Sequence, residues 1–137
     1  MENPLLKKMW ARPGYTMLVQ NSPEGFLESL QPVPLDAQVV TAGDGPFDWA
    51  LLFVRNRTEI DQFTQGMIAR VRPQAVVWFA YPKGGKAAGT DINRDQGWES
   101  LYSTGWEPVT QVAIDAVWSA LRFKPLAEIP SRRRPAA

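Results

Sequence analysis

Two nearly continuous apolar segments, residues 47–54 and 75–81, constrain the fold of this chain more than any other feature. Only Asp48 interrupts the first of them. Strands without polar alternation are typical of the middle of a sheet that is covered on both faces. Between the two segments, from Thr58 to Val71, apolar residues recur with the helical period. A strand, a helix and a second strand of this kind predict a parallel unit, because parallel neighbours need a crossover connection.

The rest of the chain continues this alternation of strands and helices. We expect further helices over residues 3–9, 22–30 and 90–103, and further strands over residues 15–20, 38–41, 109–114 and 117–123. The last two strands are joined by almost nothing around Asp115, so they should form an antiparallel hairpin near an edge of the sheet. The sequence therefore predicts an α/β fold: a Rossmann-like three-layer αβα sandwich with a mostly parallel sheet of about six strands and a C-terminal antiparallel hairpin.

Particular residues are expected to start and end two of these helices. Ser22 should cap the helix that runs to Leu30. Thr58 should cap the long amphipathic helix, with Asp61 as its capping-box partner, and Pro73 should close that helix.

Length and composition favour one domain. The chain has 137 residues, of which 45% are hydrophobic, enough for one continuous core. We expect a single domain over residues 1–124 and a flexible tail over 125–137, where proline and arginine are frequent. The net charge is +1, and the basic excess is concentrated in this tail, around Arg132–Arg134, which disfavours nucleic acid as a partner of the domain itself.

The absence of two residue types excludes several chemistries. The chain contains no cysteine and no histidine. Catalysis by Ser-His-Asp or Cys-His groups, thiol redox chemistry, disulfides and the usual zinc sites are therefore excluded, and we expect no metal. No apolar run approaches the roughly 18 residues that span a bilayer, and residues 1–10 do not resemble a secretory signal. We expect a cytoplasmic protein that does not enter membranes.

The order of elements from Leu5 to Phe123 resembles a shortened class I methyltransferase fold, whose sheet also finishes with an antiparallel strand. That resemblance implies that S-adenosylmethionine lies over a glycine-rich turn after the first strand. It also implies an acidic residue that binds the ribose after the second strand, and a catalytic segment of the Asp/Asn-Pro-Pro type after the next strand. The matching places hold one glycine within residues 19–25, then Asp44, then Arg55-Asn56-Arg57. These departures predict a degenerate cofactor pocket. We therefore expect no bound cofactor and favour a non-catalytic binding or interaction domain over an enzyme.

A second resemblance rests on five short segments: Asn21-Ser-Pro-Glu-Gly-Phe-Leu27, Tyr81-Pro-Lys83, Thr90-Asp-Ile-Asn-Arg-Asp95, Val112-Ala-Ile-Asp115 and Trp118-Ser-Ala-Leu-Arg-Phe123. As a set they are similar to a family of small uncharacterised bacterial proteins, described as a domain of unknown function. This resemblance implies the same Rossmann-like fold and assigns no activity.

A loop rich in glycine and lysine, residues 82–89, follows the strand over residues 75–81. Ligands bind outside the carboxyl ends of the strands in open α/β sheets. Lys83 and Lys86 flank Gly84 and Gly85, and the first amides of the helix expected over residues 90–103 should lie nearby. Together they predict an anion site at the edge formed by residues 82–95. The alternative is a solvated connection whose lysines only maintain solubility.

The polar residues that follow this loop extend the candidate site. Capping of the expected helix would explain Thr90 and Asp91, but it does not explain Asn93 and Arg94, which could hold a ligand. Arg55 follows the strand over residues 47–54 at the same sheet edge. These residues support an alternative function, an enzyme or sensor that binds a small anionic ligand such as S-adenosylmethionine, a nucleotide or a phosphate.

Tryptophan is unusually frequent, with six residues. Trp49 and Trp78 fall in the apolar strands and should be buried. The remaining four are Trp10, Trp98, Trp106 and Trp118. We expect at least two of these four to be buried, whereas an exposed one would indicate a protein partner or a homodimer.

Overall fold

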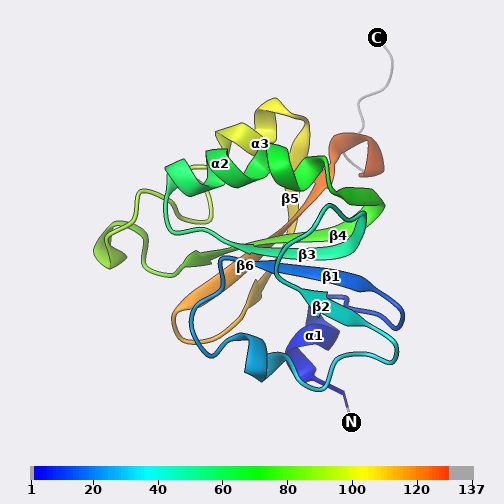
Figure 1. Ribbon diagram of the computed structural model, residues 1–137. Helices are drawn as coiled ribbons and strands as arrows, with labels where there is room; N and C mark the ends of the chain where they lie inside the picture. The colour runs from blue at the N-terminus through cyan, green and yellow to red at the C-terminus, as the bar shows by residue number, and fades with distance from the viewer. Residues whose placement is uncertain (1, 130–137) are drawn as a thin grey trace.

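The computed structural model describes residues 2–129, which build one mixed six-stranded sheet in the order β2-β1-β3-β4-β6-β5 (Figure 1). The strands are β1 (Thr16–Gln20), β2 (Gln38–Val40), β3 (Phe47–Phe53), β4 (Val71–Pro82), β5 (Trp106–Ala113) and β6 (Trp118–Pro125). The first four are parallel, and β6 is antiparallel to both of its neighbours. All six predicted strands and the C-terminal hairpin are confirmed.

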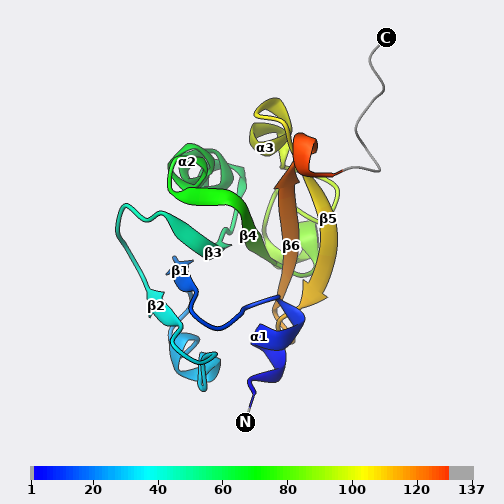
Figure 2. The same ribbon diagram turned by 90° about the vertical axis from the view of Figure 1, so that its right-hand side faces the viewer.

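Helices are few and cover both faces of the sheet. They are α1 (Pro4–Lys8), α2 (Arg57–Ile68) and α3 (Glu99–Ser103), with short 3-10 turns η1 (Leu27–Leu30), η2 (Gly85–Ala88) and η3 (Leu126–Glu128). Two views at right angles place α2 and α3 on one face and α1 on the other (Figures 1 and 2). This arrangement is an α/β, Rossmann-like fold with sparse helical layers.

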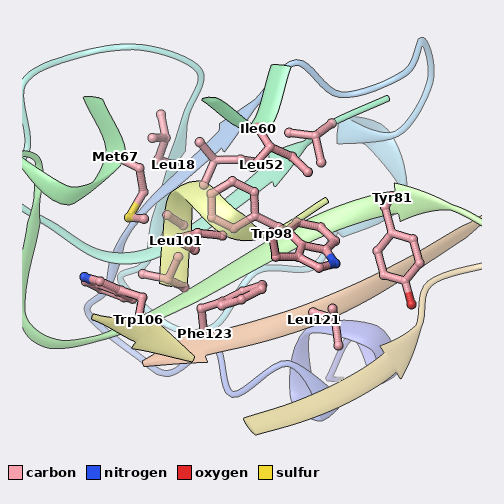
Figure 3. Close-up of a cluster of buried hydrophobic side chains, with 14 of the residues drawn as sticks. Leu18, Leu52, Ile60, Met67, Tyr81, Trp98, Leu101, Trp106, Leu121 and Phe123 are labelled. Carbon is pink, nitrogen blue, oxygen red and sulfur yellow. The ribbon is translucent and has the colours of Figure 1, made fainter. Parts of the chain in front are cut away.

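The core has one apolar cluster on each face of the sheet. On the α2 side, Trp98 is fully buried and its ring meets those of Phe79, Tyr81 and Phe123 at centroid distances of 6.0, 5.7 and 5.2 Å (Figure 3). Figure 3 also shows Ile60 of α2 close to this cluster. These contacts anchor the loop before α3 to the end of the sheet that carries Tyr81.

On the α1 side, two buried indoles share one acceptor. The indole nitrogens of Trp49 and Trp78 both donate to the carbonyl oxygen of Met9, at 2.8 and 3.0 Å. A buried carbonyl with two donors leaves no polar group unsatisfied there, so both tryptophans can lie in the core as predicted.

The expected helix over residues 22–30 is wrong. Only η1, Leu27–Leu30, is helical, as a single 3-10 turn, and Phe26 precedes it in a turn closed by its amide and Pro23 O. The backbone is left-handed at Asn21 (φ +62°) and at Gly25 (φ +83°), which interrupts any continuous helix. Phe26 packs instead against Phe53 at the end of β3, with a centroid distance of 4.8 Å.

The expected helix over residues 90–103 is also wrong, because α3 begins only at Glu99. The side-chain oxygen of Asn93 accepts from the amides of Asp95 and Gln96, at 2.8 and 2.9 Å. Local side-chain bonds of this type compete with helical bonds. The helix start that was expected to supply amides to an anion site does not exist at Thr90.

Helix α2 begins and ends at other residues than predicted. Its cap is Asn56, whose side chain accepts from the Glu59 amide, and not Thr58 with Asp61. The helix ends at Ile68, before Pro73. Pro73 lies within β4, where the pairing with β3 is interrupted, a position at which a strand tolerates proline.

The connection from β2 to β3 consists of residues 41–46 alone, without a helix. Arg70, which follows α2, holds this crossover in place. Its guanidinium donates to Gly43 O at 3.0 Å and to the side-chain oxygen of Gln20 at 2.9 Å, and its Nε donates to Gly66 O. The crossover is therefore fastened both to β1 and to the end of α2.

The C-terminal residues of the described chain pack on the sheet. The Leu126 amide donates to Gly105 O at 2.7 Å, Glu128 accepts from the Gln74 amide, and Ile129 is buried. Residues 130–137, which include Arg132–Arg134, lie outside the described residues, so the division into a domain and a tail stays a prediction. Within residues 2–129, no helix has the length and apolar character that a membrane crossing requires.

Candidate functional site

The point at which the strand order of the sheet reverses lies between β1 and β3. This switch point is where open α/β sheets bind ligands at the carboxyl ends of their strands. Here the side-chain amide of Asn21 donates to Phe53 O at 2.8 Å and ties the two strand ends together. The ring of Phe53 meets Phe26 on one side and Trp118 on the other, at 4.8 and 5.0 Å. At the switch point a hydrogen bond therefore joins the ends of β1 and β3, and aromatic rings pack next to it.

An open pocket of about 350 Å³ lies at the carboxyl end of the next strand, β4. Figure 1 shows β4 leading into the loop at this end of the sheet. The lining comes from the end of β4, the loop after it, the loop before α3 and the β5–β6 hairpin. The lining residues are Tyr81, Pro82, Lys83, Gly84, Gly85, Lys86, Asn93, Arg94, Gln111 and Ser119.

The lining carries three positive charges, Lys83, Lys86 and Arg94, and no acidic side chain. The Lys83 ammonium donates to the backbone oxygen of Asp115 at 2.5 Å. Arg94 makes one solvent-exposed ion pair at 3.5 Å with Asp95, outside the pocket. Within residues 2–129, the Lys86 side chain has no hydrogen bond or ion pair. Exposed ion pairs contribute little, so the positive charge of this pocket is largely uncompensated.

A chain of hydrogen bonds orients the polar groups of the pocket. Arg94 Nε donates to the side-chain oxygen of Gln111 at 2.7 Å, and the Gln111 amide donates to the Tyr81 hydroxyl at 2.9 Å. Burial raises the pKa of Tyr81 above its ordinary value, against smaller lowering effects of Ser119 and Arg94. The phenol therefore keeps its proton at neutral pH, and its O–H is available to Ser119 or to a ligand in the pocket.

The structure brings together six of the nine residues predicted for the site: Lys83, Gly84, Gly85, Lys86, Asn93 and Arg94. Thr90 and Asp91 line a neighbouring pocket of about 700 Å³ that shares Lys86 and Asn93 with the first. These two residues bond the segment that follows β3: the Thr90 hydroxyl donates to Arg55 O, and the Asp91 side chain accepts from the Arg57 amide at 2.9 Å.

Arg55 lines neither pocket. Its guanidinium lies over the ring of Trp118, 5.4 Å from the centroid, and its backbone amide donates to Glu59. The predicted positive cleft therefore consists of Lys83, Lys86 and Arg94, without Arg55.

The sequence reasoning missed Tyr81, Gln111 and Ser119. Tyr81 ends the apolar segment of residues 75–81, and its side chain belongs to the buried cluster on the α2 side of the sheet. Gln111 and Ser119 reach the pocket through strand register, since Tyr81 pairs with Ser119 across β4 and β6. The one available signal was the position of Tyr81 directly before the predicted loop. Among the described residues, no group of three or more acidic side chains could hold a metal ion.

No family model and no curated protein matches the chain. Membership of the family of small bacterial proteins therefore stays a prediction.

Several solved structures of methyltransferases have a similar fold. The fold is similar to that of a ribosomal protein L11 methylase from Lactobacillus delbrueckii subsp. bulgaricus, with a TM-score of 0.58 and 10% identity over 88% of this chain and 74% of that chain. For TrmN from Thermus thermophilus the TM-score is 0.58 and the sequence identity 12%, and the match covers 89% of this chain and 47% of that chain. For a TehB-like SAM-dependent methyltransferase from Corynebacterium glutamicum the TM-score is 0.56 and the sequence identity 11%, and the match covers 90% of this chain and 86% of that chain. At these identities the similarity confirms a methyltransferase-like, Rossmann-like fold and nothing further.

Proposed function

We propose that this chain is a non-catalytic Rossmann-like binding domain that holds the anionic group of a small ligand in the pocket at the end of β4. The observation that carries the proposal is the lining itself: Lys83, Lys86 and Arg94 converge on one pocket whose lining contains no carboxylate. A negative charge in the pocket would compensate these three positive charges, and no side chain of the lining supplies one.

Each polar group of the pocket has a distinct part in holding an oxyanion. The two lysines act as point charges, whereas the planar guanidinium of Arg94 can form two parallel bonds to a phosphate or carboxylate. Gln111 orients Arg94 and accepts its Nε–H, Nη1 makes the exposed 3.5 Å contact with Asp95, and Nη2 is left for the ligand. Tyr81 adds a neutral donor. The adjoining pocket, which shares Lys86 and Asn93, offers space for the rest of a nucleotide or sugar phosphate.

The chemistry of the lining favours binding over catalysis. Proton transfer near neutral pH needs a group that gains and loses a proton there, usually histidine or a perturbed carboxylate. The lining has neither, and burial moves the pKa of Tyr81 further from neutrality. The bond from Asn21 to Phe53 O supports the same conclusion for the switch point, because it joins the two strand ends between which this fold binds ligands.

The second candidate function is an S-adenosylmethionine-binding enzyme or sensor. The structural similarity to methyltransferases favours it. A ligand at the switch point would have to displace the Asn21 amide from Phe53 O, which makes this candidate the weaker of the two.

Thermal unfolding of the full chain with inorganic phosphate tests the proposal. A ligand at ten times its Kd stabilises the folded state by ~1.4 kcal/mol, or a few degrees in Tm. We expect phosphate to raise Tm relative to chloride of equal ionic strength, and S-adenosylmethionine to leave Tm unchanged. The Lys83→Ala/Arg94→Ala double variant should lose most of the shift.

A matched control removes two positive charges elsewhere, those of the exposed Lys8 and the half-buried Lys124, and should keep the full phosphate shift. An undiminished shift in the Lys83→Ala/Arg94→Ala variant would contradict the site. A shift produced by S-adenosylmethionine but not by phosphate would favour the second candidate.

A further inference from the structure

The pocket of about 700 Å³ that adjoins the pocket at the end of β4 has a different chemistry from its neighbour. The two share Lys86 and Asn93, so a ligand anchored at the end of β4 would extend its body into this second space. Both volumes are within the range of about 300–1,000 Å³ that is typical of small-molecule sites. This second space, the Asp91 pocket, is lined by Arg57, Lys86, Gly89, Thr90, Asp91, Ile92, Asn93 and Gln96.

The wall formed by residues 89–97 is held in place although these residues form no helix or strand. The indole of the buried Trp98 donates to Asn93 O at 2.8 Å. Gly97 has φ +107°, and a Cβ atom there would overlap the side chain of Ile92, so the backbone packs directly on the loop. Because the wall is fixed without a ligand, binding does not have to order it.

Asp91 presents a carboxylate with one oxygen that has no partner. Its Oδ1 accepts from the Arg57 amide at 2.9 Å, which orients the carboxylate. Its Oδ2 makes no hydrogen bond or ion pair within residues 2–129, and the side chain is exposed. A carboxylate can only accept hydrogen bonds, and it repels other anions. The part of a ligand that meets Asp91 must therefore be a hydrogen-bond donor and not a second oxyanion.

The positive charge at the far side of the Asp91 pocket is compensated. The guanidinium of Arg57 forms an exposed ion pair with Glu99 at 3.8 Å, and its Nε donates to Asp91 O at 3.4 Å. The uncompensated cations lie instead around the pocket at the end of β4, where the lining has no carboxylate. This distribution of charge fits a ligand with one anionic group and an uncharged body.

The remaining lining favours hydroxyl groups over a nucleobase. Among the described residues that line the Asp91 pocket none is aromatic, so a base would lack the ring on which bases commonly stack. The side chain of Gln96 is exposed, and its Nε2 has no hydrogen bond in the described part of the chain. A hydroxyl group can donate to Asp91 and accept from Gln96, whereas an ammonium group can only donate.

We infer that the ligand of this site is a monophosphorylated sugar. Its phosphate lies at Lys83, Lys86 and Arg94, and its ring hydroxyls lie in the Asp91 pocket. One hydroxyl donates to Asp91 Oδ2, and another accepts from Gln96 Nε2. The inference rests on the proposed function, because the phosphate has to be held at the end of β4.

Calorimetric titration of the full chain with matched phosphate monoesters tests the inference. Glucose 1-phosphate and ribose 1-phosphate carry a hydroxylated ring, cyclohexyl phosphate carries a ring without hydroxyls, and inorganic phosphate has the anion alone. We expect at least one of the two sugar phosphates to bind about tenfold or more tightly than cyclohexyl phosphate. AMP and glucose 1,6-bisphosphate should bind no more tightly than that sugar phosphate.

Variants of the Asp91 pocket show whether it causes this preference. Asp91→Asn keeps an oxygen that can accept from the Arg57 amide, so the loop should be retained, but it removes the carboxylate. It should lose most of the preference for the sugar phosphate over cyclohexyl phosphate. Gln96→Ala truncates an exposed side chain and should reduce the same preference. Asp44→Asn makes the matched change at an exposed carboxylate that lines neither pocket, and it should keep the preference.

The failure of this inference and the failure of the proposed function give different results. If neither inorganic phosphate nor any of the esters binds, the proposed function is wrong and the inference falls with it. If phosphate binds but cyclohexyl phosphate binds as tightly as both sugar phosphates, or AMP binds more tightly than both, only the inference is overturned. A preference that survives both Asp91→Asn and Gln96→Ala would also overturn it.

Discussion

Gly45→Ala should lower the free energy of unfolding by about 3–5 kcal/mol, the largest loss of stability that we expect from one added methyl group. A Cβ atom at this position would lie 2.4 Å from Arg70 O and 2.9 Å from Phe47 N. Both atoms belong to the backbone, and they are joined by a 2.7 Å hydrogen bond that starts β3, so neither can move aside without breaking the strand pairing. Urea denaturation of the variant measures this loss.

Gly14→Ala is the matched control for this variant. Gly14 has φ +79° and Gly45 has φ +77°, but a Cβ on Gly14 would meet no atom within 4 Å. Only the cost of the left-handed conformation remains at Gly14, about 1–2 kcal/mol. Similar losses in both variants would contradict the close packing of the crossover of residues 41–46 against the end of α2.

Lys86→Glu should weaken the binding of inorganic phosphate by about tenfold or more, which corresponds to ~1.4 kcal/mol. The substitution changes the pocket lining from three positive charges to two positive and one negative. The Lys86 side chain is exposed and makes no hydrogen bond or ion pair within residues 2–129, so the fold should be unaffected. Calorimetric titration with phosphate measures the change in Kd, and high salt should reduce the difference between variant and wild type.

Lys124→Glu is the control for this charge reversal. It makes the same chemical change next to Gln74 and Glu128, at the opposite ends of the parallel strands. Phosphate binding should be close to that of the wild type in this variant. An equal loss in both variants would show that net charge, and not the pocket, governs the affinity for phosphate.

Strands were predictable because apolar runs report burial directly. Residues 47–54 and 75–81 became β3 and β4, and the short connection at Asp115 did produce the hairpin. Helices were predicted less well where polar side chains bond locally. Asn93 resembles a residue of a first helical turn, but its side chain accepts two loop amides and prevents the helix from starting before Glu99.

Site residues that are close together in the sequence were predictable, whereas those contributed by strands far away in the sequence were not. Lys83, Lys86 and Arg94 could be proposed because a flexible loop follows a central strand. Gln111 could not, since its approach to Tyr81 depends on how β5 and β6 pair. Trp98, Trp106 and Trp118 are buried, in agreement with the expectation that at least two of the four would be, whereas Trp10 is exposed.

An amide-resolved NMR titration of the wild-type chain with inorganic phosphate shows directly whether the pocket at the end of β4 binds an anion. We expect saturable shifts concentrated at residues 83–86 and 93–94, with a change in the side-chain amide signal of Gln111. The amide signals of residues 21–25 at the switch point should not shift. Shifts confined to residues 21–25, or no saturable shift anywhere in the chain, would contradict the claim that the pocket at the end of β4 is the binding site of this protein.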